Sequence, residues 1–365
     1  MKNVIDYFKE LHQIPELSGL EYKTSDYIFS ALTNMGYSPV RLGDTGVYAD
    51  LISDKALPWL LFRADIDGLA ITEESGLSYS SKHDGCMHAC GHDGHTSMLL
   101  AAAGILRNEK LPQNIRFVFQ PAEENVQGAV AMIAGGIFDV SPICAFAMHL
   151  WPKLPLGALE IRSGSLMASG DVFHIYCHGR SVHCAQREKG ADALLAAVRI
   201  ANALPSIEEK GKEHGTLLFC GNLQGGTTHN IVANEASLWG TLRTYSSACR
   251  TEIIQLLEHT VSHIGKELNV QTEVQWESCC PVVENHPSLI QELTQLFPQL
   301  NTQTEPTLAA EDFAYYQQHC PSAMLWLGLG DTAPLHSKNF AVPKDVLPIG
   351  VDTWVKIAQH KWNNF

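Results

Sequence analysis

The chain has 365 residues, of which 45% are hydrophobic and 18% are charged, and its formal net charge is −14 at pH 7. This composition is typical of a soluble globular protein of two or three domains, and the acidic balance disfavours nucleic acid as the main partner. The N-terminal segment has no secretory apolar region, no apolar run is long enough for a membrane helix, and the ten cysteines form no CxxC pair. We therefore expect a cytoplasmic protein with reduced thiols.

Two helices are expected at the start of the chain. Apolar spacing predicts the first over residues 4–14, and Pro15 would end it. For the second helix, Ser25 is the expected N-terminal cap and Gly36 the expected stop.

Strand and helix patterns alternate over the next part of the chain. The expected strands are residues 47–52, 57–68, 114–124 and 143–152, and the expected helices between them are residues 95–108 and 126–138. Such alternation predicts a mostly parallel α/β sheet covered on both faces. The functional crevice of such a sheet lies outside the carboxyl ends of its strands. Since Asp65, Asp67, Glu123, Glu124 and His149 lie at the ends of three strands, we expect them to meet at one edge.

The segment Met87–His95, MHACGHDGH, concentrates side chains that bind metals. Thiolate, neutral imidazole and carboxylate are the protein ligands of Zn²⁺-like ions. Cys90 and His92 are the expected ligands, while the other polar side chains of the segment would orient them or cap a helix that starts near Thr96. A surface loop that is His-rich by chance is the alternative.

A different order of elements follows residue 170. The expected elements are strand 171–179, helix 191–204, strands 215–223 and 235–246, helix 248–268 and strand 270–279. This β-α-β-β-α-β order is the split βαβ unit of a ferredoxin-like domain. It predicts an inserted α+β domain at residues 168–280, so that residues 1–167 and 281–365 would form the α/β domain. Helix, strand and helix patterns end the chain at residues 286–297, 322–330 and 345–362.

The adjacent carboxylates Glu123 and Glu124 favour hydrolytic chemistry. Neighbouring side chains at the end of a strand point in different directions, so one can bind a metal while the other faces a substrate water. A metal-activated water with a nearby carboxylate base is suited to amide hydrolysis. Two solvated surface glutamates are the alternative, and His149 and His336 are core histidines unless the metal cluster forms.

These motifs resemble those of the M20 peptidase family, in the subfamily of aminoacylase, hippurate hydrolase and auxin-conjugate amidohydrolase. The similar segments span nearly the whole chain: HQIPELSGLE (12–21), LFRADIDGLAITEESGL (61–77), MHACGHDGHTSMLL (87–100), FQPAEENVQGAVAMI (119–133), MHLWPKLPLGAL (148–159), GTLRT (240–244), AAEDFAYY (309–316) and LHS (335–337). The MHACGHDGH and FQPAEE motifs together are the most specific of these.

The resemblance implies two divalent metal ions per subunit, Zn²⁺ or Mn²⁺ before Co²⁺ or Ni²⁺. Cys90 would bridge the ions. The remaining ligands would be His92, Glu124, His149 and His336. Glu123 would act as general base and then as general acid, and the carboxylates of Asp65 and Asp67 would orient ligands from behind.

The resemblance also makes the inserted domain a lid and a dimerisation domain, in a homodimer or a larger homo-oligomer. His183, in GRSVHCA, would donate a hydrogen bond to the oxyanion, within one subunit or across the dimer interface. Asn230 and Arg243 would hold the substrate carboxylate, with a structural ion pair as the alternative for Arg243. The chain departs from the family at DGLA (67–70), HCAQREKG (183–190) and GGTTHNIVAN (225–234), which leaves its substrate preference open.

The expected reaction is hydrolysis of the amide of an N-acetyl, N-benzoyl or related N-acyl amino acid to a carboxylate and a free amino acid. Neither nucleic acid nor a membrane is an expected partner. Three alternatives stay open: an exopeptidase that uses the same site on dipeptides or C-terminal residues, a hydrolase with Cys90 as nucleophile, and a non-enzymatic protein of the same fold that binds a metal or a partner. The sequence does not choose the acyl group, the amino acid or the metal.

Overall fold

The computed structural model describes residues 2–363, and the chain divides into two compact units. The first, which we call the α/β unit, comprises Met1–Leu166, Val283–Glu305 and Asp312–Phe365. The second, the inserted unit, comprises Met167–Val282 and Pro306–Glu311. The sequence pattern did not associate Pro306–Glu311 with the inserted unit.

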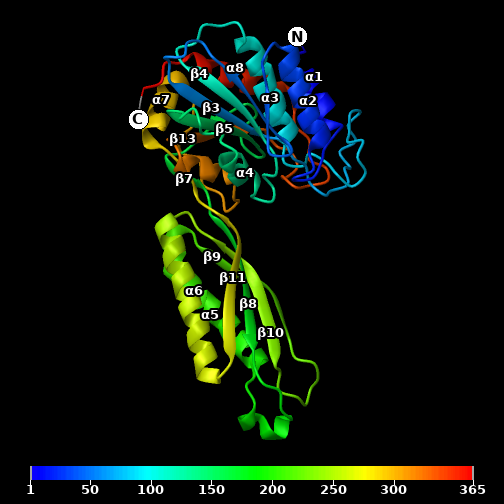
Figure 1. The fold of residues 1–365 in the computed structure, drawn as a ribbon, viewed down its shortest axis with the longest axis vertical. Helices are drawn as coiled ribbons and strands as arrows, with labels where there is room; N and C mark the ends of the chain where they lie inside the picture. Colours follow the sequence, from blue (N-terminus) through cyan, green and yellow to red (C-terminus); the bar gives the residue numbers. More distant parts are fainter. Residues whose placement is uncertain (1, 364–365) are drawn as a thin grey trace. The chain divides into compact units, whose positions relative to one another are not determined.

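The α/β unit is built on a seven-stranded sheet in the order β1-β2-β4-β3-β5-β13-β6. Figure 1 labels its central strands β4, β3, β5 and β13. The strands of the sheet are β1 (Val40–Leu42), β2 (Gly46–Leu51), β3 (Trp59–Asp65), β4 (Asn114–Gln120), β5 (Cys144–Trp151), β6 (Leu159–Glu160) and β13 (Ser322–Gly328). The central strands β4, β3, β5 and β13 are parallel, whereas β1, β2 and β6 pair antiparallel to their neighbours. Every residue of β4 and β13 is buried, as expected for strands covered on both faces. The predicted mostly parallel α/β sheet is confirmed.

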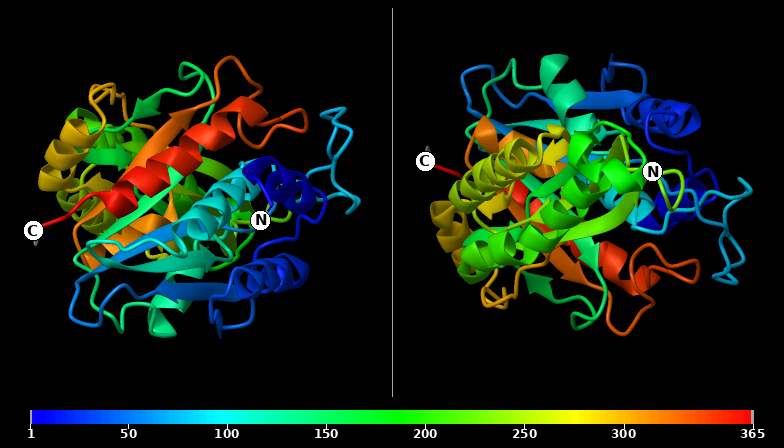
Figure 2. Two further views of the ribbon diagram at one scale, coloured as in Figure 1. Left: turned by 90° about the horizontal axis from the view of Figure 1, so that it is seen from above. Right: turned by 90° about the horizontal axis from the view of Figure 1, so that it is seen from below.

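Helices cover both faces of this sheet. They are α1 (Val4–His12), α2 (Tyr22–Asn34), α3 (His92–Leu106), α4 (Gly128–Ala134), α7 (Pro287–Leu296) and α8 (Leu347–Gln359), with 3₁₀ turns η3 (Asp312–Gln318) and η4 (Lys344–Val346). Helix α3 packs against α1 and α8 (Figure 2). Phe62 of β3 packs on Trp354 of α8 with ring centroids 4.9 Å apart. The next residue, Arg63, points to the other face, because strand side chains alternate, and it bonds Asp312 of η3.

Helix α3 begins at His92, four residues before the predicted start near Thr96. Gly91 precedes it with φ +90°, a left-handed conformation that glycine adopts without strain. His92 and the other polar residues of the first turn are buried, so the MHACGHDGH segment is part loop and part helix. The apolar pattern placed the start too late, because the residues of the first turn are polar although they are buried.

Two other boundaries differ from the predictions. Helix α2 begins at Tyr22 rather than after a Ser25 cap, because Ser25 is buried within the helix and accepts a hydrogen bond from Arg41. Strand β4 ends at Gln120, so the paired glutamates lie in the turn that follows and not in the strand itself.

The inserted unit has a four-stranded antiparallel sheet in the order β11-β8-β10-β9. Its elements are β8 (Gly170–His178), η1 (Cys184–Lys189), α5 (Ala193–Glu208), η2 (Glu209–His214), β9 (Leu217–Gly225), β10 (Glu235–Arg243), α6 (Ser247–Leu268) and β11 (Gln271–Cys280). This is the predicted ferredoxin-like order. Apolar residues of β8 and β10, among them Ile175 and Leu238, pack with residues of α5 and α6 such as Ile200 and Leu257. A further short pair joins β7 (Gly164–Met167) to β12 (Val283–Asn285), and all of its residues except Met167 belong to the α/β unit.

Two further observations concern the described residues as a whole. No helix within residues 2–363 combines the length and the apolar character needed to cross a bilayer. Nine cysteines are described with their side chains, and all nine are free thiols.

Candidate metal centre

The predicted metal ligands meet at the carboxyl ends of the parallel strands of the α/β unit. Their donor atoms form two groups, within each of which all atoms lie within 4.8 Å of one another. One group is Cys90, His92 and His149, and the other is Cys90, Glu124 and His336. The Cys90 Sγ atom lies 3.6 Å from His149 Nε2, and His336 Nε2 lies 3.4 Å from Glu124 Oε1. Cys90 thus belongs to both groups, in the position of a shared ligand.

Two of these donor atoms are buried and lie near charged groups, yet neither forms a hydrogen bond within the described chain. Neither His92 Nε2 nor Glu124 Oε1 has a hydrogen-bond partner among the described residues. Leaving a buried polar atom unpaired costs about 1–3 kcal/mol, so the arrangement favours a species that binds both atoms. Sulfur, imidazole nitrogen and carboxylate oxygen are the donors of Zn²⁺ and related ions. The residues present therefore fit two divalent ions that share Cys90.

Asp67 holds two of these donor-bearing residues in place. Its Oδ1 lies 2.9 Å from His92 Nδ1, while its Oδ2 accepts hydrogen bonds from the backbone N of Glu124 at 3.0 Å and the Ser18 hydroxyl at 2.7 Å. Burial acts to raise the pKa of Asp67, but His92 and the other donors outweigh it and lower the pKa. A carboxylate bonded to Nδ1 directs Nε2 of the imidazole toward the centre and fixes its tautomer.

Asp65 supports the same region through His95. Its Oδ1 lies 2.6 Å from His95 Nδ1, and His95 Nε2 accepts a hydrogen bond from the backbone N of Leu150 at 2.8 Å. Asp65, His92 and His95 lie close enough together to hold an ion. Because both ring nitrogens of His95 already have partners, its role in this geometry is to brace the start of α3.

The turn that carries the paired glutamates is stabilised by a hydrogen bond to a buried carboxylate. Ala122 has φ +54°, a left-handed conformation that is uncommon for residues other than glycine. Its backbone N donates at 2.8 Å to the carboxylate of Glu21, which is fully buried and belongs to HQIPELSGLE. Glu123 is 7% exposed, and its Oε2 lies 3.9 Å from His92 Nε2. Supported backbone strain of this kind clusters at functional sites.

The backbone of His336 is strained and anchored in the same way. Its φ is +60°, and its N donates at 2.8 Å to the carbonyl of Ala89, the residue before Cys90. The loop after β13 is thereby tied to the thiol-bearing segment, although the His336 side chain itself is 52% exposed.

The sequence interpretation missed a buried ion network beneath the first turn of α3. His12 Nδ1 lies 2.7 Å from Asp93 Oδ2, and His12 Nε2 lies 3.2 Å from Glu73 Oε1. Burial acts to lower the pKa of His12, but the two carboxylates raise it to about 10. His12 is therefore cationic at neutral pH. Its place in HQIPELSGLE was the only sequence signal of this role.

Burial also governs two further side chains of the MHACGHDGH segment. It lowers the pKa of His88 to about 4, so this imidazole is neutral, and its Nδ1 lies 3.1 Å from the carbonyl oxygen of Asp67. Burial, followed by the charge of Glu124, raises the pKa of the Cys90 thiol well above its ordinary value. A thiolate at this position needs nearby positive charge, which divalent ions supply.

The predicted substrate-binding side chains lie in the inserted unit. His183 forms a β-bridge with Ile231, and the backbone N of Cys184 donates to Asn230 O at 2.9 Å, so His183 and Asn230 occupy neighbouring segments. His183 Nδ1 accepts a hydrogen bond from the backbone N of Ala185 at 3.2 Å. In the neutral imidazole the proton then sits on Nε2, which makes the exposed end of His183 a donor.

Arg243 ends β10 and lies over the backbone of Gly170, where a Cβ atom would come within 2.1 Å of its Nη1. Among the described residues no carboxylate forms an ion pair with Arg243. Arg250 of the same unit differs, because its guanidinium donates two hydrogen bonds to the buried Asp171. Within the described chain, the alternative of a structural ion pair at Arg243 is therefore not observed.

Comparison with known proteins gives the family. The sequence profile of peptidase family M20/M25/M40 matches residues 61–360. The chain belongs to this family. It is 33% identical over 355 residues to an N-acetyl-L-cysteine deacetylase of Bacillus subtilis (strain 168), covering 95% of this chain and 85% of that protein. It is 32% identical over 354 residues to an N-acetyldiaminopimelate deacetylase of Streptococcus uberis (strain ATCC BAA-854 / 0140J), covering 92% and 93%.

Solved structures agree with this M20 assignment. The Bacillus subtilis YXEP protein, described as a dinuclear metal-binding peptidase of the M20 family, superposes with a TM-score of 0.87 at 29% identity, over 97% of this chain and 96% of that one. An aminohydrolase-like protein of methicillin-resistant Staphylococcus aureus gives a TM-score of 0.92 at 25% identity, over 98% and 95%. The M20 family and the hydrolase class predicted from the motifs are confirmed.

Proposed function

We propose that this M20 protein is a metal-dependent amidohydrolase that converts N-acyl amino acids to a carboxylate and a free amino acid. The relatives described above are named as deacetylases of N-acetylated amino acids. The observation that carries the proposal is the pair of three-residue donor groups that share Cys90. Such a pair suits two divalent ions, Zn²⁺ or Mn²⁺ before Co²⁺ or Ni²⁺.

The ions and the protein divide the chemistry. Bound at these donors, the ions would polarise the acyl carbonyl and lower the pKa of a water toward about 7. Asp67 keeps His92 and Glu124 oriented for them. The low exposure of Glu123, Glu124 and His149 strengthens the electrostatic interactions among these side chains.

Glu123 is the proton carrier in this proposal. Its carboxylate lies beside His92 and forms a further group of close donors with His92 and Glu124, but it belongs to neither of the two groups that share Cys90. It accepts a proton from the attacking water and then delivers that proton to the nitrogen of the leaving amino acid. A single carboxylate in both roles contributes about 10²–10⁴-fold to the rate.

The inserted unit would bind the substrate. His183 Nε2–H is a donor for the oxyanion that forms at the acyl carbon, and Arg243, which has no ion pair in the described chain, is a clamp for the α-carboxylate. Asn230, on the segment beside His183, would add an amide donor. In this assignment the α/β unit performs the bond cleavage and the inserted unit selects the substrate.

A hydrolysis panel tests the proposed substrate class. The purified enzyme is assayed with N-acetyl and N-benzoyl amino acids and with dipeptides, each with Zn²⁺ and with Mn²⁺. We expect the N-acyl amino acids to have the higher kcat/KM. Preference for dipeptides would instead identify an exopeptidase that uses the same centre.

Chelation separates metal chemistry from a Cys90 thiol mechanism. Reactive thiols have a lowered pKa, whereas burial raises that of Cys90. We expect dialysis against a chelator to abolish hydrolysis and added Zn²⁺ or Mn²⁺ to restore it. Activity that survives chelation would favour the thiol mechanism.

We propose homodimerisation through the inserted unit and a cytoplasmic location. Strand β9 is the edge of its sheet, and its sequence LLFCGNLQG has no charged residue to block pairing with another strand. Phe219 on this strand is 58% exposed. Light scattering should show a dimer for the wild type and a monomer for Phe219→Lys; an unchanged mass would place any interface elsewhere.

The proposed cytoplasmic location fits the free cysteines, because thiols stay reduced in a reducing compartment.

A further inference from the structure

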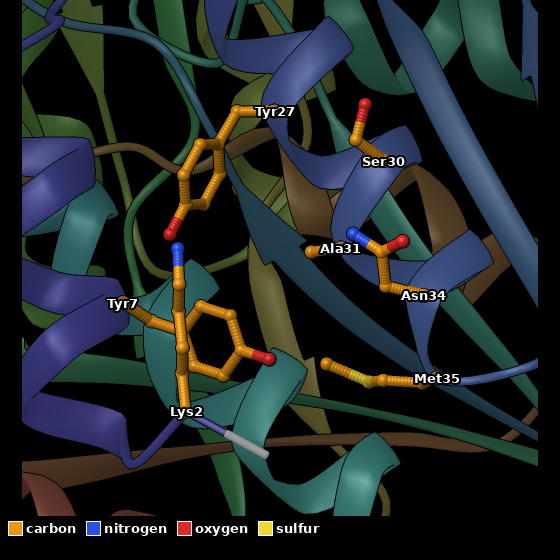
Figure 3. Close-up of a pocket in the computed structure, with 7 residues that line it drawn as sticks. All are labelled: Lys2, Tyr7, Tyr27, Ser30, Ala31, Asn34 and Met35. Carbon is orange, nitrogen blue, oxygen red and sulfur yellow. The ribbon is translucent and has the colours of Figure 1, made fainter.

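A cavity of about 600 Å³ lies between α1 and α2, apart from the donor groups of the metal centre. It is lined by Lys2, Tyr7, Tyr27, Ser30, Ala31, Asn34 and Met35 (Figure 3). Its walls are mixed, because two phenol rings, an alanine and a methionine provide apolar surface while an ammonium, an amide and hydroxyls provide polar atoms. A cavity of this size and character suits a small organic molecule.

The hydroxyl of Tyr7 faces this cavity without a protein partner. Tyr7 is 4% exposed, yet its hydroxyl forms no hydrogen bond with the described residues. Figure 3 shows it directed toward the part of the cavity that Asn34 and Met35 line. Burial, followed by the charge of Glu10, raises the pKa of Tyr7, so the phenol stays protonated and can donate. The hydroxyl oxygen is therefore accessible from the cavity, where a bound molecule can accept its hydrogen bond.

The neighbouring polar groups define the charge of that ligand. Tyr27 differs from Tyr7, because its hydroxyl donates to Glu10 at 2.6 Å. The Lys2 ammonium shares this carboxylate oxygen and lies 5.3 Å above the Tyr27 ring. An ammonium has three N–H donors, so Lys2 keeps donors for a second acceptor. The lining includes this ammonium and no carboxylate, while Glu10 pairs with the ammonium from outside the lining, so the cavity suits a hydrogen-bond acceptor better than a second cation.

We propose that this cavity binds a small organic carboxylate with an apolar body. The carboxylate would accept hydrogen bonds from the Tyr7 hydroxyl and the Lys2 ammonium, and the body would pack on Met35, Ala31 and the Tyr27 ring. The proposal is independent of the hydrolytic function, because none of the lining residues belongs to the metal centre.

Methyl NMR of the metal-loaded enzyme tests this site directly. The chain has eight methionines, and ¹³C-methyl labelling gives each a signal; the Met35 signal is assigned by its loss in Met35→Leu. Titration with benzoate should shift the Met35 methyl signal in a saturable way. In Tyr7→Phe, which removes only the hydroxyl, the affinity should fall about tenfold, as expected for a hydrogen bond to a charged group.

A blocking variant and its control locate the binding. Ser30→Trp places a large side chain at the exposed wall and should abolish the benzoate-dependent shift. Thr33→Trp, which adds the same side chain to the same helix outside the lining, should leave it unchanged. Benzamide, the neutral analogue, should bind at least tenfold more weakly. An unmoved Met35 signal, or equal binding by Tyr7→Phe and by benzamide, would overturn the proposal.

Discussion

The two units of this protein hold their functional side chains in opposite ways. In the α/β unit, His92 and Glu124 are held by Asp67, and His95 is held by Asp65. In the inserted unit, the exposed side chain of His183 has its one hydrogen bond within the described chain at Nδ1, from the backbone N of Ala185, while Arg243 has no ion pair there. The side chains proposed to cleave the bond are thus preorganised by their own unit, whereas those proposed to bind the substrate keep donors available for an outside partner.

Loss of the proton carrier tests the catalytic side of this contrast and should have the largest effect. We expect Glu123→Gln to lower kcat about 10²–10⁴-fold while metal content stays near that of the wild type, because Glu123 is outside both groups that share Cys90. Stopped-flow or steady-state hydrolysis and elemental analysis measure the two quantities. A variant that kept most of its rate would remove Glu123 from this role.

Removal of the buried histidine tests how much the α/β unit depends on its hidden ion network. His12→Gln should destabilise the fold by about 3 kcal/mol at neutral pH, since it leaves Asp93 and Glu73 without their cation. The folded pKa of about 10 lies above the ordinary 6.5, so this stabilisation is complete below pH 6.5 and is lost as pH rises through 10.

Urea unfolding at pH 6 and pH 10.5 therefore measures the His12 effect. We expect a large difference between wild type and His12→Gln at pH 6 and a much smaller one at pH 10.5. His259→Gln, at an exposed position of α6, serves as the control and should show little difference at either pH. A penalty of equal size at both values would mean that His12 acts by packing and not by its charge.

Asp67→Asn tests whether the α/β unit preorganises the proposed metal ligands. Loss of this orienting carboxylate should weaken metal affinity about 10–100-fold, because His92 Nδ1 and the Glu124 backbone both bond to it. Competition with a chromophoric chelator measures this affinity. Ser18→Ala removes only a hydroxyl donor to the same carboxylate and should have a much smaller effect.

A substitution in the inserted unit should change substrate binding and leave metal binding unchanged, and its effect should be the smallest of the four. Arg243→Lys keeps the charge but loses the planar fork, and we expect KM to rise about tenfold with metal content unchanged. Titration of rate against substrate, with elemental analysis of the same sample, checks both. A loss of bound metal in this variant would contradict the separation of roles between the units.

The sequence predicted those parts of the site that depend on local patterns. Glu124 and His149 follow or end apolar strands, and parallel strands bring such positions to one edge. Cys90 and His92 stood out because ligand types were crowded into one segment. His336 was predicted only by family resemblance, since nothing nearby in the sequence marks it as a ligand.

The supporting contacts could not be predicted because they join distant segments. His12 meets Asp93 across 81 residues, and Glu21 meets the backbone of Ala122 across 101. Neither pairing leaves a periodic signal. The early start of α3 at His92 was hidden for a related reason: its first turn carries buried polar residues, whose partners become visible only in three dimensions.

Metal content is the most direct test of the central claim that Cys90 is shared by two ions. Elemental analysis of the purified enzyme is compared with that of Cys90→Ala and His149→Ala. We predict about two divalent ions per chain in the wild type, about one in His149→Ala, which belongs to one donor group, and well below one in Cys90→Ala, which belongs to both. A wild type that binds at most one ion, or a Cys90→Ala variant that keeps two, would contradict the account.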